Sequence, residues 1–161
     1  MTKVNAPERK IEASICSLDS NILLYTLDEN APAKRDAAVR LLKLARFHKW
    51  PLSGQVIGEV YRRVQGRGWQ WTHGQAKTWV DLLLRHNTVL PASAENYLSA
   101  LKLAGNSNRQ FWDCLIIASC AAHGVKRLYT EDTGAEPHTI LGVELINPFF
   151  REDWDDGLEF S

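Results

Sequence analysis

The sequence has few of the residues that cross-link a fold through disulfides or metal ions. Its cysteines are Cys16, Cys114 and Cys120, an odd number with no Cys-x-x-Cys pair. We therefore expect buried free thiols in a reducing compartment and no disulfide framework. The five histidines are scattered without a His-x-x-x-His pair, which argues against a zinc site.

Signals for secretion or membrane insertion are also lacking. We find no run long and apolar enough to cross a bilayer, and residues 1–10 are polar, without the apolar centre of a secretory signal. A cytoplasmic protein with no membrane partner is therefore expected. The formal net charge is zero, so any contact with nucleic acid must come from a local basic patch.

Several catalytic motifs are missing as well. The sequence has no Gly-x-Ser-x-Gly elbow of a serine hydrolase and no glycine-rich loop with a lysine that would bind phosphates. A phosphoaspartyl enzyme needs Asp-x-Asp after its first strand, but here Asp19 is followed by Ser20 and Asn21. These absences exclude three ways of attacking or transferring a phosphoryl or acyl group.

What the sequence does contain is a regular alternation of short apolar strands and amphipathic helices. Strands are predicted near residues 14–18, 50–53, 88–90, 126–130 and 141–146, and helices near 20–27, 33–49, 54–65, 71–86, 93–104 and 111–122. Because the connections are short, this order predicts a three-layer α/β/α fold with a small parallel sheet. The expected domain spans residues 14–148, with a lead-in at 1–13 and an acidic tail at 149–161.

Three carboxylates are predicted to meet at one edge of this sheet. Asp19 ends the first strand, and Asp132 follows the strand that ends at Thr130. Asp113 opens the 111–122 helix, which runs antiparallel to the next strand, so Asp113 lies at the edge where Thr130 ends. Unpaired acids are costly to bury together. A hard divalent cation with oxygen ligands, Mg²⁺ or Mn²⁺, would hold them.

Each acid also has a purely structural interpretation. Asp19 is placed to cap a helix, and Asp113 to complement a helix dipole. Asp132 could form a turn before Gly134, and Glu59 could lie on the solvated side of its helix. Each structural interpretation is favoured for the residue taken alone, but the shared sheet edge weakens them jointly.

Read in order, four segments resemble PIN-domain proteins of the VapC toxin type. They are Leu18-Asp19-Ser20-Asn21-Ile22-Leu23, Glu59 within a helix, Phe111-Trp112-Asp113-Cys114-Leu115-Ile116 and Leu128-Tyr129-Thr130-Glu131-Asp132. The resemblance covers about residues 15–148. It implies a cytoplasmic, metal-dependent endoribonuclease of a type II toxin–antitoxin pair, with a small parallel sheet between helices. It also implies an antitoxin partner, whose tail enters the acidic groove, and a homodimer.

The resemblance assigns roles residue by residue. It implies a catalytic quartet of Asp19, Glu59, Asp113 and Asp132, of which Asp19, Asp113 and Asp132 hold the metal. Ser20 or Asn21 and Thr130 match accessory polar positions, and either Glu131 or Asp132 could face the metal. The alternative function is a non-catalytic nucleic-acid-binding or interaction module on the same fold.

Basic and aromatic side chains near the acids are candidates for RNA contacts. Phosphate contacts are assigned to Arg62, Arg63 and Arg67 near Glu59 and to Arg109 beside Asp113, although a solvated helix face explains each arginine equally well. Stacking on unpaired bases is open to Trp69, Trp71 and Trp112. Trp112 is instead expected in the core, and Trp79, Leu82 and Leu83 are expected to face inward.

Overall fold

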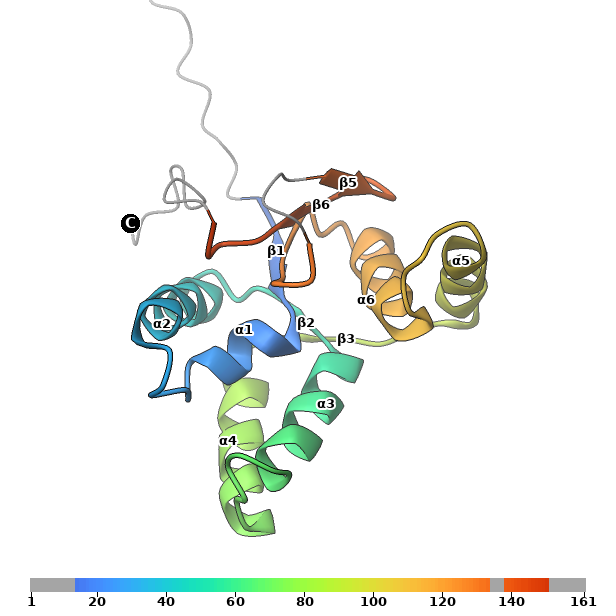
Figure 1. Ribbon diagram of the computed structural model, residues 1–161. Coiled ribbons are helices and arrows are strands. Elements are labelled where there is room, and N and C mark those ends of the chain that lie inside the picture. Colours follow the sequence, from blue (N-terminus) through green and yellow to red (C-terminus); the bar gives the residue numbers. More distant parts are fainter. Residues whose placement is uncertain (1–13, 134–137, 151–161) are drawn as a thin grey trace, which may run out of the picture.

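The structure is a computed structural model that describes residues 14–133 and 138–150 (Figure 1). The expected lead-in at 1–13 and most of the expected tail lie outside the described residues, as do residues 134–137. The described elements follow one another in the order β1 (Cys16–Leu18), α1 (Ser20–Tyr25), α2 (Pro32–Phe47), β2 (Leu52–Ser53), α3 (Gly54–Gln65), α4 (His73–His86), β3 (Val89–Leu90), α5 (Ala94–Gly105), α6 (Phe111–Ala122), β4 (Arg127–Tyr129), β5 (His138–Ile140) and β6 (Val143–Ile146).

The strands form a four-stranded sheet of order β1-β4-β6-β5 and a separate two-stranded sheet of β2 and β3. β4 is parallel to β1 on one side and to β6 on the other, so the predicted parallel sheet is present. β5 was not predicted, and it pairs antiparallel with β6. The structure adds two features that were not predicted, the separation of β2 and β3 into a second sheet and the antiparallel edge at β5.

A tight turn explains the error at residues 141–146, which were predicted to be one strand. Ile140 pairs with Val143, so Leu141 and Gly142 form a two-residue hairpin loop. Both have positive φ, 52° and 79°, as a type I′ turn requires. β6 therefore begins at Val143, two residues later than predicted.

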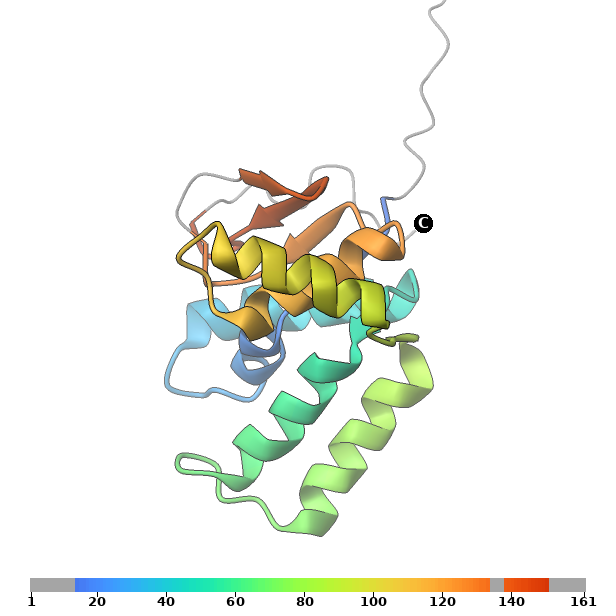
Figure 2. The ribbon, with the colours of Figure 1, turned by 90° about the vertical axis from the view of Figure 1, so that its right-hand side faces the viewer.

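Helices cover both faces of the larger sheet. α1 and α2 lie on one side of β1, and α6 with α5 lies on the other (Figure 1). α3 and α4 pack against each other as a helical hairpin that extends away from the sheet (Figure 2). The predicted three-layer arrangement is thus present, with the α3–α4 hairpin at the carboxyl side of β1.

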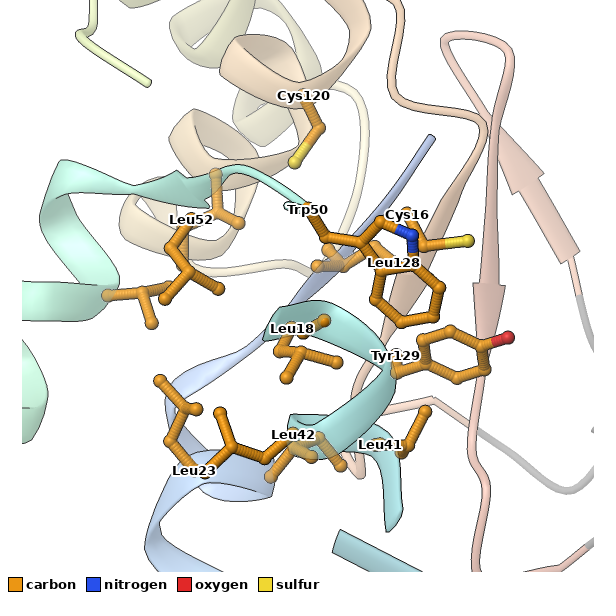
Figure 3. Close-up of a cluster of buried hydrophobic side chains, with 14 of the residues drawn as sticks. Cys16, Leu18, Leu23, Leu41, Leu42, Trp50, Leu52, Cys120, Leu128 and Tyr129 are labelled. Atoms are coloured by element: carbon orange, nitrogen blue, oxygen red, sulfur yellow. The ribbon is translucent and has the colours of Figure 1, made fainter. Parts of the chain in front are cut away.

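The core fills the space between β1, β4 and the helices on either side. The rings of Trp50 and Tyr129 stack there with centroids 5.9 Å apart, close to Leu18 (Figure 3). The 111–122 helix was predicted to be buried, and α6 is buried continuously from Cys114 to Cys120. Two orientations were wrong: Trp112 is 55% exposed and Leu82 is 42% exposed.

All three cysteines are buried free thiols, as expected. Burial raises the pKa of Cys16 and of Cys120 to about 12, so both remain protonated near neutral pH. Among the described residues, no helix has the length and apolar character needed to cross a membrane.

Candidate functional site

The carboxyl ends of β1 and β4 bring Asp19 and Thr130 together. Leu18 pairs with Tyr129 in the parallel ladder, so the residues that follow them are neighbours. The Thr130 hydroxyl donates to Asp19 Oδ2 at 2.8 Å. Asp19 Oδ1 also accepts from the backbone N–H of Ser20 at 2.7 Å and so caps α1. Asp19 therefore both caps α1 and contributes a carboxylate to the site.

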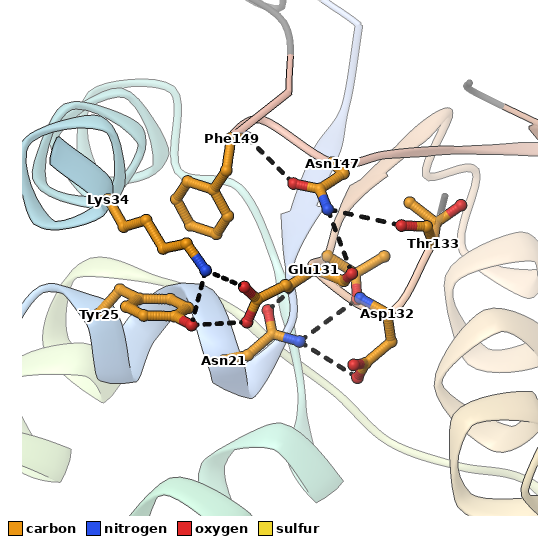
Figure 4. A network of polar contacts seen from close by, with 9 residues as sticks. Asn21, Tyr25, Lys34, Glu131, Asp132, Thr133, Asn147 and Phe149 are labelled. Atoms are coloured by element: carbon orange, nitrogen blue, oxygen red, sulfur yellow. Dashed lines mark hydrogen bonds and ion pairs between the residues drawn. The ribbon is translucent and has the colours of Figure 1, made fainter. Parts of the chain in front are cut away.

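Asn21 ties α1 to the loop after β4 (Figure 4). Its Nδ2 donates to Asp132 Oδ2 at 3.2 Å, and its Oδ1 accepts from the backbone N–H of Glu131 at 3.1 Å. The Thr130 hydroxyl oxygen accepts from the backbone N–H of Asp132 at 3.1 Å. Ser20 contributes its backbone N–H to Asp19, and its side chain is buried.

The two acids at 131 and 132 turn in different directions (Figure 4). Glu131 accepts a hydrogen bond from the Tyr25 hydroxyl at 2.7 Å and forms an ion pair with Lys34. Asp132 instead lines a narrow pocket together with Asp19. Of the two acids left open by the sequence, Asp132 is the one at the pocket.

This central pocket also receives residues from α6. It is lined by, among others, Asp19, Arg109, Asp113, Thr130 and Asp132. Glu59, on α3, lines an adjoining pocket together with Asp113. The four acids predicted from the sequence thus belong to four segments that meet around one place, as the predicted topology requires for Asp19, Asp113 and Asp132 and as the resemblance implies for Glu59.

The electrostatics of the site reflect this crowding of acids. The pKa of Asp19 is raised to about 6, mainly by burial and also by the charges of Asp132 and Glu59, while the hydrogen bonds from Thr130 and Ser20 oppose the shift. Burial and the same two neighbouring acids raise the pKa of Asp113, and Arg109 opposes that shift. Arg109, and Arg63 at 4.0 Å from Glu59, therefore balance only part of the negative charge of the four acids.

The four predicted arginines lie in different places. Arg109 lines the central pocket, and its guanidinium donates to His138 Nε2 at 2.5 Å. Because an arginine cannot accept, His138 carries its proton on Nδ1 and donates it to the Thr133 hydroxyl at 2.9 Å. Arg62 lines the pocket that contains Glu59 and Asp113, and Arg63 lines a different pocket that contains Asn21 and Glu131.

Arg67 follows the end of α3 and lines none of these three pockets. His138 was missed by the sequence analysis because it belongs to β5, a three-residue strand without a detectable pattern. Asn147 was also missed as part of this region. Its Nδ2 donates to the backbone carbonyls of Glu131 and Thr133 at 3.2 and 3.4 Å, which holds the loop after β4 from the β6 side.

The donor set consists of oxygens, which suits a hard divalent cation better than a soft one. Within the part of the chain that the structure describes, however, no three Asp, Glu, His or Cys side chains stand together as a ready metal cluster. Asp19 and Asp132 are held in place by hydrogen bonds. Asp113 and Glu59 approach from helices and influence the other acids through their charge.

Comparison with known proteins identifies related folds. The model of the family described as PIN domain matches residues 17–136. A search among curated proteins gave no match. The structure of FitAB bound to an IR36 DNA fragment is similar with a TM-score of 0.63 and 19% identity, over 85% of this chain and 97% of that chain.

Two further solved structures have the same fold. Mycobacterium tuberculosis VapC20, described as a sarcin–ricin loop cleaving toxin, has a TM-score of 0.57 and 19% identity, over 73% of this chain and 89% of that chain. Rickettsia felis VapBC2, bound to a DNA fragment from its promoter, has a TM-score of 0.55 and 18% identity, over 73% of this chain and 86% of that chain. At these identities the likeness establishes the fold, including the small parallel sheet with helices on both sides.

Proposed function

This chain belongs to the PIN domain family, and from that premise we propose that it is a metal-dependent endoribonuclease that hydrolyses RNA phosphodiester bonds. The observation that carries the proposal is the meeting of Asp19, Asp113 and Asp132 in one pocket, with Glu59 beside it. Asp19 is buried, and the charges of Asp132 and Glu59 oppose its ionisation, a cost in free energy that a structural role alone does not require. Binding of a cation and a phosphate at this site would explain why such an unfavourable arrangement is present.

The cation that fits these donors is Mg²⁺ or Mn²⁺, held by Asp19, Asp113 and Asp132. When bound, it supplies charge that polarises the scissile phosphate and lowers the pKa of a coordinated water. Glu59 is the remaining carboxylate, and we assign it to orient the attacking water by accepting a hydrogen bond from it. Arg109 lies in the same pocket and is assigned to the phosphate oxygens.

Thr130 and Asn21 have a positioning role in this proposal. The Thr130 hydroxyl fixes the Asp19 carboxylate, and the Asn21 amide fixes that of Asp132. Hydrogen bonds to ligating carboxylates orient them and keep them ionised. Attack by water leaves a 3′-hydroxyl on the RNA, without the cyclic phosphate that attack by the ribose would leave.

We also propose that the protein acts in the cytoplasm as the toxin of a type II toxin–antitoxin pair. The structural neighbour described as a sarcin–ricin loop cleaving toxin supports RNA as the substrate. The FitAB and VapBC2 neighbours support an antitoxin partner. Growth arrest on expression, relieved by a neighbouring open reading frame, is the expected result. Harmless expression of an enzyme that is active in vitro would refute the toxin assignment.

The nuclease proposal is tested by incubating a panel of RNAs with Mg²⁺, Mn²⁺ or EDTA. We expect cleavage with either cation, none with EDTA, and none by folded Asp19→Asn or Asp113→Asn variants. Asp81→Asn is the matched control, because Asp81 lies on α4 and forms an ion pair with Lys77. Cleavage retained by a nuclease-free, folded preparation of either site variant would overturn the proposal.

One observation favours the alternative, a non-catalytic nucleic-acid-binding or interaction module. It is the lack of a ready cluster of three ligand side chains among the described residues. Titration with Mn²⁺ decides between the two functions. Binding that is lost in Asp113→Asn supports the nuclease, whereas no detectable binding by the native protein supports the module.

A further inference from the structure

Two larger pockets lie next to the central pocket and approach it at different residues, Asp113 and Asn21. The first, which we call the Trp112 pocket, is lined by Gln55, Glu59, Arg62, Gln110, Trp112 and Asp113. It shares Asp113 with the central pocket. Trp112 has no role in the core, because 55% of its surface is exposed. An aromatic side chain is therefore presented to solvent directly beside the acids.

The second, which we call the Trp69 pocket, is lined by Asn21, Tyr25, Asp28, Arg63, Trp69 and Glu131. It reaches the central pocket through Asn21, whose amide donates to Asp132. Lys34 and Phe149 lie on one side of the Tyr25 ring (Figure 4), with the Lys34 amine 4.8 Å from the ring centroid. The Tyr25 hydroxyl is held by Glu131, so the wall of this pocket is fixed in place.

Size separates these two pockets from the central one. The Trp112 pocket has a volume of about 520 Å³ and the Trp69 pocket about 170 Å³, whereas the central pocket has about 10 Å³. A volume near 10 Å³ accommodates about one water or ion. Of these three pockets, the two flanking ones have room for a group as large as a nucleobase.

The same chemistry recurs on the two sides. Each pocket contains one tryptophan and one arginine, and the arginines are consecutive on α3. Consecutive helical residues point about 100° apart, so Arg62 and Arg63 reach different pockets from one helix. The carboxylates Glu59 and Asp28 repel phosphate but accept hydrogen bonds from the N–H groups of bases. This combination suits a base inside each pocket and a phosphate at its rim.

We propose that the Trp112 and Trp69 pockets each bind one unpaired base of the RNA, on opposite sides of the phosphate to be cleaved. The inference rests on the proposed function and refines its substrate to a single strand with splayed bases. Aromatic side chains bind such strands by stacking, and they tolerate any base. Arg62 and Arg63 neutralise the phosphates next to the two bases.

The test measures the affinity of a labelled single-stranded RNA by fluorescence anisotropy, with Ca²⁺ in place of Mg²⁺ and the RNA checked for integrity. Trp112→Leu and Trp69→Leu are each expected to weaken binding about fivefold or more, since each removes one stacking surface. Trp112→Phe and Trp69→Phe keep an aromatic ring and should restore most of the affinity. Phe47→Leu is the control, because Phe47 is a 48% exposed aromatic on α2 that lines neither pocket.

A second series identifies which base each pocket binds. An abasic nucleotide is moved one position at a time along the RNA, and each RNA is tested with every variant. For each tryptophan, one abasic position should weaken RNA binding by the native protein. The same abasic position should have no effect on RNA binding by the corresponding leucine variant. The positions paired with Trp112 and Trp69 should differ and lie on opposite sides of the cleavage position mapped with Mg²⁺.

The outcomes separate this inference from the proposed function. Metal-dependent cleavage by the native protein, with folded leucine variants that bind RNA as tightly as Phe47→Leu, would overturn the two base pockets and leave the nuclease intact. Coupled tryptophan and abasic effects without any cleavage would support the pockets and count against the nuclease. Unchanged RNA affinity with loss of an inhibitory protein partner would assign the pockets to that partner and overturn the inference.

Discussion

Ionisation of Asp19 is expected to destabilise the metal-free protein within a defined pH window. Burial raises the pKa of this carboxyl from 3.8 to about 6 in the folded state. The folded protein therefore holds the proton more tightly than the unfolded chain does. The free energy of unfolding should fall as the pH rises from about 4 to about 6, and this contribution should then stay constant.

The magnitude follows from the pKa difference and from two hydrogen bonds. A rise from 3.8 to about 6 corresponds to a loss on the order of 3 kcal/mol. Asp19→Asn removes this loss, but an amide can accept only one of the bonds from Thr130 and Ser20. The lost bond costs roughly 1 kcal/mol. The variant should be about 1 kcal/mol less stable than the native protein at pH 4 and about 2 kcal/mol more stable at pH 7.5.

Urea denaturation in EDTA, followed by circular dichroism at several pH values, measures this difference. Asp81→Asn is the matched control, because the hydrogen bond from Lys77 lowers the pKa of Asp81. Its loss should therefore destabilise the protein more at pH 7.5 than at pH 4, which is the opposite trend. A native-minus-Asp19→Asn difference that stays flat between pH 4 and pH 7.5 would refute the reasoning.

Four further predictions concern other parts of the fold. Thr130→Val removes the group that orients Asp19 and should weaken Mn²⁺ binding about tenfold or more by calorimetry. Mn²⁺ at about 100 times its Kd should stabilise the native protein by about 2.7 kcal/mol, and Asp113→Asn should lose most of this gain in thermal melts. Gly124→Ala should cost about 1–2 kcal/mol in urea, because φ is +74° there and no other atom obstructs the new Cβ. Ile117→Ala, at a fully buried position of α6, should cost about 2–5 kcal/mol in the same assay.

The parts of the fold that could be predicted are those with a strong local pattern. α6 was placed within one residue because an apolar run that begins after a polar loop and ends before Gly124 has clear limits. The prediction that Asp19 and Asp132 share one sheet edge followed from the assumption of a parallel sheet, and β1 and β4 do pair in parallel. Topology alone thus brought three acids to one sheet edge.

The parts that could not be predicted depend on contacts distant in sequence. β5 has only three residues, none of them fully buried, and it exists through its pairing with β6. The turn before β6 places Leu141 at φ 52°, a conformation that the local preference of leucine disfavours. No local signal reports a strand that is stabilised mainly by its neighbour.

The orientation of Trp112 shows a different limit. Its neighbours in the sequence are apolar, so composition favoured the core, but α6 becomes buried only from Cys114 onward. Trp112 and Asp113 occupy the turn before that point, where the helix reaches the rim of the sheet. A tryptophan at a helix start beside a carboxylate is therefore better interpreted as part of a site than as core.

The three proposed metal ligands fall into two groups. Asp19 and Asp132 are fixed by hydrogen bonds, whereas Asp113 on α6 interacts with the other acids through its charge. Asp19 and Asp132 are held by hydrogen bonds from Thr130 and Asn21, which connect the ends of β1 and β4. Asp113 has no hydrogen-bond partner for its side chain among the described residues, and it is influenced by the other acids through repulsion. Among the described residues, Asp113 therefore does not complete a ready cluster of three ligand side chains with the fixed pair. A divalent cation between these carboxylates would replace their mutual repulsion with attraction, so under the proposed function the ion, and not a direct hydrogen bond, would join the two groups.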